Sequence, residues 1–343
     1  MIGHLLKPEI AELIHARNFT QLRELLVGFA AGDIAEIFTD LNPEEEAVLL
    51  RVLPRQLSAE VFGHLTHADQ EALLHALAKE DVAAILNDMT PDDRTALLEE
   101  LPSSATQKLL ELLSVEERKV ATDLLGYPKH SIGRLMTPQF VAIQQHWTVA
   151  EVLAHLRREE RKRAAMNQLY VVDGHGRLVD FVRLRNLVVA PPEKPVVELL
   201  EGHYFALHAS DDRETAVAAF NKYDVTILPV VDTREELVGV VTVDDVLAVA
   251  EKEATEDIQR LGGMEALDAP YLRIGLTEMI KKRSGWLALL FMGEMLTATA
   301  MNHFEDELAH AIVLGSFLPL IISSGGNSGS QATSLIKIGR AHV

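Results

Sequence analysis

Residues 308–336 read LAHAIVLGSFLPLIISSGGNSGSQATSLI, a run that contains no Asp, Glu, Lys or Arg. Its first half, up to Ile322, is almost wholly apolar, and a helix needs about 20 such residues to cross a bilayer. The second half is rich in glycine, serine and amide side chains, which a membrane tolerates only where protein or water satisfies them. The stretch therefore predicts a spanning helix that reaches a polar, protein-lined pathway, which is typical of membrane transport proteins.

A first span is expected just upstream, over Ser284–Phe304. The basic triplet at 281–283 precedes it, and by the positive-inside rule this puts the preceding domains in the cytoplasm. Glu294 interrupts the span, so it must face a protein or aqueous interior, or be protonated. Residues 302–307 would form a short external turn before the second span. We therefore expect a multi-pass protein of the cell (inner) membrane.

Composition narrows the class of protein further. The chain of 343 residues carries 51 acidic against 32 basic residues, which argues against nucleic acid as a partner. It has no cysteine, so it has no disulfide framework, thiolate metal site or cysteine nucleophile. The first residues lack the pattern of a signal peptide. Most of the chain is expected to stay in the cytosol.

Residues 1–130 contain a repeat with a period of about 24 residues, which is in the range of stacked helical or solenoid repeats. Each unit opens with a residue that favours a helix N-cap, then an acidic first turn and apolar residues at helical spacing. The unit starts are Leu41-Asn-Pro-Glu, Leu65-Thr-His-Ala, Met89-Thr-Pro-Asp and Leu113-Ser-Val-Glu. A period of this length with two helix starts predicts two short helices per unit, stacked as a superhelix without a catalytic constellation. The acidic first turns are explained most simply as complements to the helix dipole.

A second repeat occupies residues 131–250. YVVDGHGRLVDFV at 170–182 returns as PVVDTREELVGVV at 229–241, and the offset between the two copies is constant along the aligned stretch. Each copy predicts strand, helix, strand, strand and helix, over about 135–190 and 199–250. This doubled pattern resembles a pair of cystathionine-β-synthase-type (CBS) domains, which implies a compact module that dimerises and binds regulatory ligands.

The second copy also matches the nucleotide motif of that domain family, with Gly239, Thr242 and Asp245 in the motif positions. The resemblance implies that the aspartate accepts from ribose hydroxyls and that the threonine meets phosphate. The first copy departs from the motif, with Asp180, Arg183 and Asn186 in the corresponding places. The alternative interpretation is that Thr242 only caps the helix that starts at Val243.

An acidic helix is expected over residues 251–270, between the CBS pair and the membrane. Glu253, Glu256 and Asp257 lie at i, i+3 and i+4, so they share one helical face. A row of carboxylates without histidine or cysteine suits hard cations such as Mg²⁺ or Ca²⁺. A merely solvated acidic face is the alternative.

The superhelix, the CBS pair, the acidic connecting (plug) helix and the span ending in GGNSGSQ together resemble the MgtE family of magnesium channels. The expected fold is thus multidomain, α and α+β, with two transmembrane α-helices of a truncated membrane domain at 271–336. The family implies a homodimer in the lipid bilayer whose cytosolic domains bind Mg²⁺ and close the pore when Mg²⁺ is ample. The resemblance to a CBS pair makes ATP a candidate second ligand.

The resemblance also carries over individual residues. Ala96 and Ala248 stand where the family can have an aspartate, so the number of regulatory sites is expected to be reduced. The positions that match regulatory Mg²⁺ ligands are Glu60, Asp92, Asp224, Asp245, Glu253, Glu256 and Asp257. Those that match the pore lining are Pro319, Gly325, Gly326, Asn327, Gly329 and Gln331.

The C-terminal end departs from the family pattern. Members of the family have five spans, whereas this chain stops near the end of the second. Residues 337–343 break the expected continuation and resemble translated adapter sequence, so we interpret them as a non-native tail on a gene fragment. The later pore helices would then be missing, and this chain by itself is not expected to conduct.

Two other functions fit parts of the sequence. One is a CBS-regulated transporter of another ion, controlled by adenine nucleotide. The other is a soluble CBS adaptor with a hydrophobic anchor, which GGNSGSQ disfavours because an anchor needs no run of glycine and amides. An enzyme is disfavoured because the sequence shows no nucleophile–base pair, phosphate-cradling loop or metal-binding histidine pair.

Overall fold

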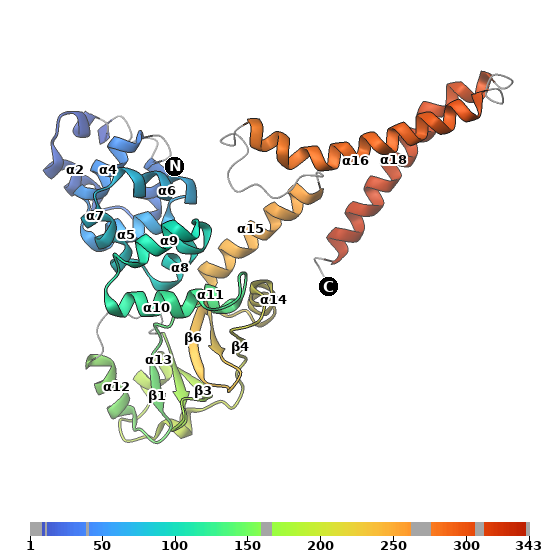
Figure 1. The fold of residues 1–343 in the computed structure, drawn as a ribbon. Helices are drawn as coiled ribbons and strands as arrows, with labels where there is room; N and C mark the ends of the chain where they lie inside the picture. Colours follow the sequence, from blue (N-terminus) through green and yellow to red (C-terminus); the bar gives the residue numbers. More distant parts are fainter. Residues whose placement is uncertain are drawn as a thin grey trace. The chain divides into compact units, whose positions relative to one another are not determined.

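The computed structural model describes residues 9–10, 12–38, 41–158, 167–261, 276–305 and 312–340. The chain divides into two compact units, Met1–Ala250 and Glu251–Val343. The first unit contains a helical domain followed by two small β-sheets with their helices (Figure 1). The second unit contains two long helices and the C-terminal part of a third.

The helical domain is built from short helices in two rows. Packing within a row joins α3 to α5 and α5 to α7, and in the other row α4 to α6, α6 to α8 and α8 to α10. The predicted unit of two helices per repeat is confirmed by these alternating contacts. The helices are α2 (Phe19–Leu26), α3 (Ala31–Phe38), α4 (Pro43–Val52), α5 (Arg55–His64), α6 (His67–Ala76), α7 (Lys79–Asp88), α8 (Pro91–Glu100), α9 (Ser103–Leu110) and α10 (Val115–Leu125).

The predicted helix caps hold one row in register. Asn42 Oδ1 accepts hydrogen bonds from the backbone N–H groups of Glu44 and Glu45, and Glu45 Oε2 accepts from the Asn42 N–H at 3.1 Å, which makes a capping box. The side chains of Thr66, Thr90 and Ser114 accept from the N–H three residues on. Helices α5, α7 and α9 begin without a side-chain cap, so the strong start signals mark alternate helices.

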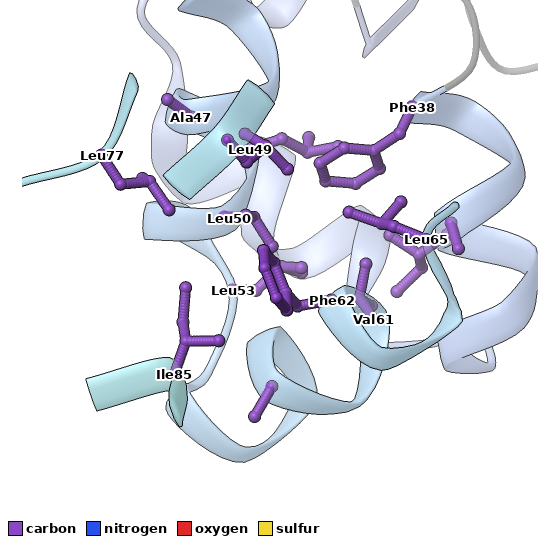
Figure 2. Packing of buried hydrophobic residues seen from close by; sticks show 14 of the residues in the cluster. Phe38, Ala47, Leu49, Leu50, Leu53, Val61, Phe62, Leu65, Leu77 and Ile85 are labelled. Carbon is purple, nitrogen blue, oxygen red and sulfur yellow. The ribbon is translucent and has the colours of Figure 1, made fainter. Parts of the chain in front are cut away.

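The core of this domain lies between the two rows. Phe38, Leu49, Phe62 and Ile85 come from α3, α4, α5 and α7, and all are buried in one cluster (Figure 2). A fully buried side chain of this size contributes about 1.5–3 kcal/mol relative to an exposed one. The apolar spacing seen in the sequence thus stabilises the stack of helices.

One position of the repeat links the two helices of a pair in three of the units. Gln70 Nε2 donates to the Phe62 carbonyl at 2.8 Å, Arg94 Nη1 to the Leu86 carbonyl at 3.0 Å, and Arg118 Nε to the Leu110 carbonyl at 2.8 Å. The donors and the acceptors both recur with the period of the repeat in these three units, whereas the first unit has Glu46 at the donor position. Each bond reaches a carbonyl near the C-terminal end of the preceding helix, where the regular helical hydrogen bonds end. Arg94 is fully buried and also pairs with Glu117 on α10.

The predicted CBS pair is confirmed by two equivalent sheets. In each, the first strand runs parallel to the second and the second antiparallel to the third, in the orders β1-β2-β3 and β4-β5-β6. The first copy comprises β1 (Ala142–Gln144), α12 (Val149–Arg158), β2 (Gln168–Val172), β3 (Leu178–Arg183) and α13 (Leu184–Val189). The second comprises β4 (Leu207–His208), α14 (Arg213–Tyr223), β5 (Ile227–Val231), β6 (Leu237–Thr242) and α15 (Val243–Leu261). The short α11 (Ile132–Leu135) precedes the first copy, and a 3₁₀ turn (Val196–Leu199) lies between the copies.

Fine detail repeats at the same constant offset between the two copies. The sheets shift register at Val171/Val172 and at Val230/Val231, and the turns that follow are closed by Asp173 and Asp232. Each aspartate accepts from the backbone N–H groups two and four residues further on, at 2.8 and 2.9 Å. The two copies therefore share their turn chemistry as well as their strand pattern.

The last helix of the second copy, α15, differs in length from its counterpart α13. It runs without a break from Val243 to Leu261, across the expected boundary at residue 251 between the CBS pair and the acidic connecting helix. Both parts are therefore one helix. The remainder of the predicted connecting segment, residues 262–270, lies outside the described residues.

The second unit contains α16 (Leu276–His303) and α18 (Ile312–Arg340). Among the described residues, one helix is long and apolar enough to cross a membrane, Met279–His303, which overlaps the predicted first span. The predicted second span falls on α18, which stays helical through Pro319 and the GGNSGSQ motif. Parts of the expected external turn and of the C-terminal tail, residues 306–311 and 341–343, lie outside the described residues.

Candidate metal-binding site

Two helices of the first unit begin with the same four-residue pattern. Thr90-Pro-Asp-Asp opens α8 in the helical domain, and Thr242-Val-Asp-Asp opens α15 in the second CBS copy. In both, the threonine Oγ1 donates to the second aspartate, at 2.9 Å to Asp93 and 2.6 Å to Asp245. Each helix thus presents two carboxylates in its first turn, where the helix dipole favours negative charge.

These two helix starts lie close enough for their charges to interact. Burial, together with the negative charges of Asp92, Asp244 and Asp93, raises the pKa of Asp245 to about 8, and the hydrogen bond from the Thr242 hydroxyl opposes the shift. Burial and the neighbouring Asp93 raise the pKa of Asp92 to about 6. Four carboxylates, two from each domain, therefore lie within range of one another's charge, and their repulsion disfavours the fully ionised arrangement.

One oxygen in this cluster has no partner within the protein. Asp92 Oδ1 is buried and accepts no hydrogen bond. A buried carboxylate oxygen without a partner is costly, because it has lost water and gained nothing in exchange. A bound cation would satisfy it, and oxygen donors alone suit a hard cation such as Mg²⁺.

Helix α5 lies against the same carboxylates. A Cβ placed on Gly63 would lie only 2.9 Å from Asp93 Oδ2, so the glycine lets the two helices approach closely. The pKa of Asp93 is raised by burial of its carboxyl group and by Asp244, and it is lowered by the nearby His64. Glu60, predicted as a ligand, lies one turn earlier on α5, where its Oε1 accepts from Gln56 Nε2 at 3.1 Å.

The other predicted ligands are not among the charges that shift these pKa values. Asp224 ends α14 in the left-handed conformation, with φ 49° and ψ 51°. Glu253, Glu256 and Asp257 lie on α15 as predicted, and Glu256 Oε2 is 3.2 Å from Arg260 Nη2. Their role in metal binding stays a prediction.

The predicted nucleotide motif has structural explanations in two of its positions. Gly239 packs against the segment before β1, where an added Cβ would lie 2.7 Å from Met136 Sδ and 3.0 Å from the Thr137 carbonyl. Thr242 precedes α15, and its hydroxyl is already engaged as the donor to the Asp245 carboxylate. In the first copy, Asp180 is buried and accepts from the N–H groups of Phe181 and Gly202, both at 2.8 Å. Nucleotide binding therefore stays a prediction.

The pore-lining residues all lie on α18, where they are exposed in this single chain. The partners that would enclose a pathway have to come from other helices.

Asp93 and Asp244 were not predicted as site residues from the sequence. The signal that could have found them is the recurrence of Thr-X-Asp-Asp at two helix starts that lie far apart in the sequence. Among the described residues, no group of three or more His, Cys, Asp or Glu side chains already has the geometry of a metal site. Mg²⁺ binding here would therefore need water molecules in its coordination shell.

The superhelix, the tandem CBS pair and the apolar helix that follows define a class: membrane proteins with a helical domain and a CBS pair ahead of the membrane segment. The family model described as the MgtE intracellular N domain matches residues 30–130, and the CBS domain model matches residues 132–193 and 185–252. The magnesium transporter MgtE of Thermus thermophilus is 37% identical over 330 residues, covering 95% of this chain and 73% of that protein. The chain belongs to the MgtE family of magnesium transporters.

Two further comparisons agree with this assignment. The magnesium transporter MgtE of Bacillus subtilis is 30% identical over 235 residues, or 66% of this chain and 50% of that protein. The chain thus spans about half the length of that relative. The crystal structure of the cytosolic domain of the Mg²⁺ channel MgtE in complex with ATP matches with a TM-score of 0.68 and 34% identity, over 71% of this chain and 100% of the other. The soluble part of a magnesium transporter matches with a TM-score of 0.69 and 26% identity, over 74% and 99%.

Proposed function

We propose that this chain carries the regulatory domains and the first membrane helices of a protein that moves Mg²⁺ across the cell membrane, closed by cytosolic Mg²⁺. Membership of a transporter family supports the first part, and a role as an enzyme does not fit such a family. In this proposal the protein is a homodimer in the inner membrane, with the superhelix and the CBS pair in the cytoplasm.

The observation that carries the regulatory part is the meeting of four carboxylates at the starts of α8 and α15, with a buried oxygen of Asp92 left without a partner. Without a cation, these charges repel and favour separation of the helical domain from the second CBS copy. A bound Mg²⁺ reverses the sign of the interaction, because each carboxylate then gains a shared counter-charge. The cation therefore selects the arrangement in which the two domains are in contact.

The helix α15 provides a continuous connection from this site. Asp244 and Asp245 lie in its first turn, and the same helix runs on to Leu261 in the direction of the membrane segment of the sequence. A change at its start can therefore be passed along one rigid element rather than through a flexible linker. Glu253, Glu256 and Asp257 on this helix would extend the Mg²⁺-sensing surface.

Regulation by adenine nucleotide is the second candidate, with transport of another ion as the related alternative. One observation favours nucleotide binding: a structure similar to this chain is the cytosolic domain of a Mg²⁺ channel in complex with ATP. Gly239 and Thr242 do not distinguish this candidate, since close packing against Met136 accounts for the glycine and the bond to Asp245 engages the threonine.

The test is thermal unfolding of the full chain in detergent during titration with Mg²⁺, Ca²⁺ or ATP. We expect Mg²⁺ at millimolar concentration to raise the melting temperature of the wild type. The Asp92→Asn and Asp245→Asn variants should lose most of that gain, whereas Glu251→Gln, a neutralised exposed carboxylate on α15, should keep it. Stabilisation by ATP together with no response to Mg²⁺ would refute the proposed sensor and favour nucleotide regulation.

A further inference from the structure

The opposite end of α8 is held to the segment that leads into the CBS pair. Arg134 belongs to the short helix α11, and its guanidinium makes three bonds. Nε donates to the Tyr127 carbonyl at 2.8 Å, Nη2 donates to the Leu125 carbonyl at 2.9 Å, and Nη1 donates to Glu99 Oε2 at 3.2 Å. One side chain therefore joins the end of α10, the last turn of α8 and the start of the CBS region.

This contact is well shielded from solvent. The side chains of Arg134 and Glu99 are 14% and 18% exposed. Shielding strengthens the attraction between the charges, and the two carbonyl bonds satisfy further donors of the guanidinium. Arginine suits this role because its planar fork of five donors can serve several acceptors at once.

Helix α8 therefore has opposite interactions at its two ends. Its first turn carries Asp92 and Asp93, which are repelled by the carboxylates of α15, whereas its last turn carries Glu99, which is attracted by Arg134. At 1.5 Å per residue, Asp92 and Glu99 are separated by about 10 Å along the helix axis. Because the last turn of α8 is held by Arg134, repulsion at its first turn should rotate the helical domain about the held end and not detach it from the CBS pair.

We propose that Arg134 and Glu99 are positioning residues that form the pivot on which the helical domain turns against the CBS pair. The pair keeps the last turn of α8 on α11, so the first turn of α8 returns to the same place opposite Asp244 and Asp245. The use of this pivot in Mg²⁺ sensing rests on the function proposed above. The geometric role of the pair stands independently of it.

The absence of cysteine from the chain makes a distance measurement straightforward, because two introduced cysteines are the only labelling sites. Exposed positions 108 on α9 and 221 on α14 report on the helical domain and the second CBS copy. The experiment carries the substitutions Lys108→Cys and Asn221→Cys, with a nitroxide spin label on each cysteine. Pulsed electron–electron double resonance on the full chain in detergent then measures the distance between the two labels. Labelled chain is diluted with unlabelled chain so that only distances within one subunit are read.

The test variant is Glu99→Gln, which removes the ion pair and leaves both carbonyl bonds of Arg134 in place. Glu99→Asp keeps the charge, and the control Glu71→Gln removes the charge of an exposed residue on α6. We expect Glu99→Gln to broaden the distance distribution and to raise about fivefold the Mg²⁺ concentration at which that distribution is half-maximally narrowed. Glu71→Gln should behave as the wild type, and Glu99→Asp should recover most of the wild-type behaviour.

An unchanged width and an unchanged Mg²⁺ midpoint in Glu99→Gln would overturn the proposal. If Glu99→Gln does not fold by circular dichroism, Arg134→Lys, which keeps the positive charge but has a shorter reach and fewer donors, takes its place with the same two readouts. If the wild type does not respond to Mg²⁺, the proposed sensor is wrong. The pivot is then judged by the width alone, which must still broaden in the variant.

Discussion

Replacing Asp245 by asparagine separates the cost of its charge from the contacts of its side chain. Asparagine has the same shape, and its carbonyl oxygen can still accept the hydrogen bond from Thr242 Oγ1, now 2.6 Å long. The start of α15 should therefore keep its local structure. What disappears is one of the four negative charges that meet at the starts of α8 and α15.

The pKa of Asp245 sets the size of the effect. Its ordinary value of 3.8 is raised to about 8 in the folded chain. At pH 7 the difference between the folded and unfolded states corresponds to about 4 kcal/mol as an upper limit, at about 1.4 kcal/mol per pKa unit. Asp245 is only half-buried, and solvent screening at such a residue reduces the expected gain to about 1–2 kcal/mol.

The sign of the pH dependence follows from the direction of the shift. A raised carboxyl pKa means that the folded state holds protons more tightly, so its stability is greatest near pH 4 and falls as the pH rises towards 8. In metal-free buffer at pH 7, we expect the melting temperature of Asp245→Asn to exceed that of the wild type by about 2–8 °C. Its fall with pH should also be shallower, and Glu251→Gln should match the wild type in both respects.

Mg²⁺ should reverse the order of the melting temperatures of the wild type and Asp245→Asn. A cation stabilises the state that binds it, so at millimolar Mg²⁺ the wild type should gain more than Asp245→Asn. Differential scanning fluorimetry of the full chain in detergent, with chelator or with Mg²⁺, measures both effects. A variant that is less stable than the wild type in metal-free buffer at pH 7 would refute the reasoning, since it would show that the charge is not a cost.

Three further substitutions probe the surrounding contacts. Gly63→Ala should lower the free energy of unfolding by about 1–3 kcal/mol, because its methyl group would clash with the Asp93 carboxylate. Denaturant titration measures this loss, and an unchanged unfolding midpoint would contradict the close approach of the two helices. Asp180→Asn should lower the free energy of unfolding by about 1–3 kcal/mol, because the amide has one accepting oxygen where the carboxylate accepts with two. An unchanged stability in urea would argue against the importance of these two hydrogen bonds. Arg94→Leu should lower the free energy of unfolding by about 3–5 kcal/mol, because Glu117 loses its buried partner. In a double-mutant cycle, adding Glu117→Gln to Arg94→Leu should recover part of that loss.

Much of the fold could be predicted because both repeats are local signals. The caps at Asn42, Thr66, Thr90 and Ser114 act within one helical turn, and the structure confirms each of them. The constant offset between the CBS copies determined strand order and turn chemistry in the same way. Neither conclusion needed knowledge of distant contacts.

The candidate site could be predicted only in part, because it depends on a distant contact. Asp92 and Asp245 were selected through the family resemblance, but the acidic first turn of α8 is equally explained by the helix dipole. Nothing local shows that the start of α8 meets the start of α15. Asp93 and Asp244 were missed for that reason, and Gly63 could not be recognised without the neighbouring carboxylate.

The repeated bonds of Gln70, Arg94 and Arg118 have a consequence for how the helical domain can change during evolution. Three of the helix pairs carry this bond within the pair, so duplication or loss of one of these units leaves the internal contacts of the other units in place. Such a change would nevertheless shift every later unit along the stack and carry the acidic turn of α8 away from its counterpart. The number of units is therefore set by the distance that the domain must span, and a gain or loss of one unit would leave a stable protein without the proposed metal site.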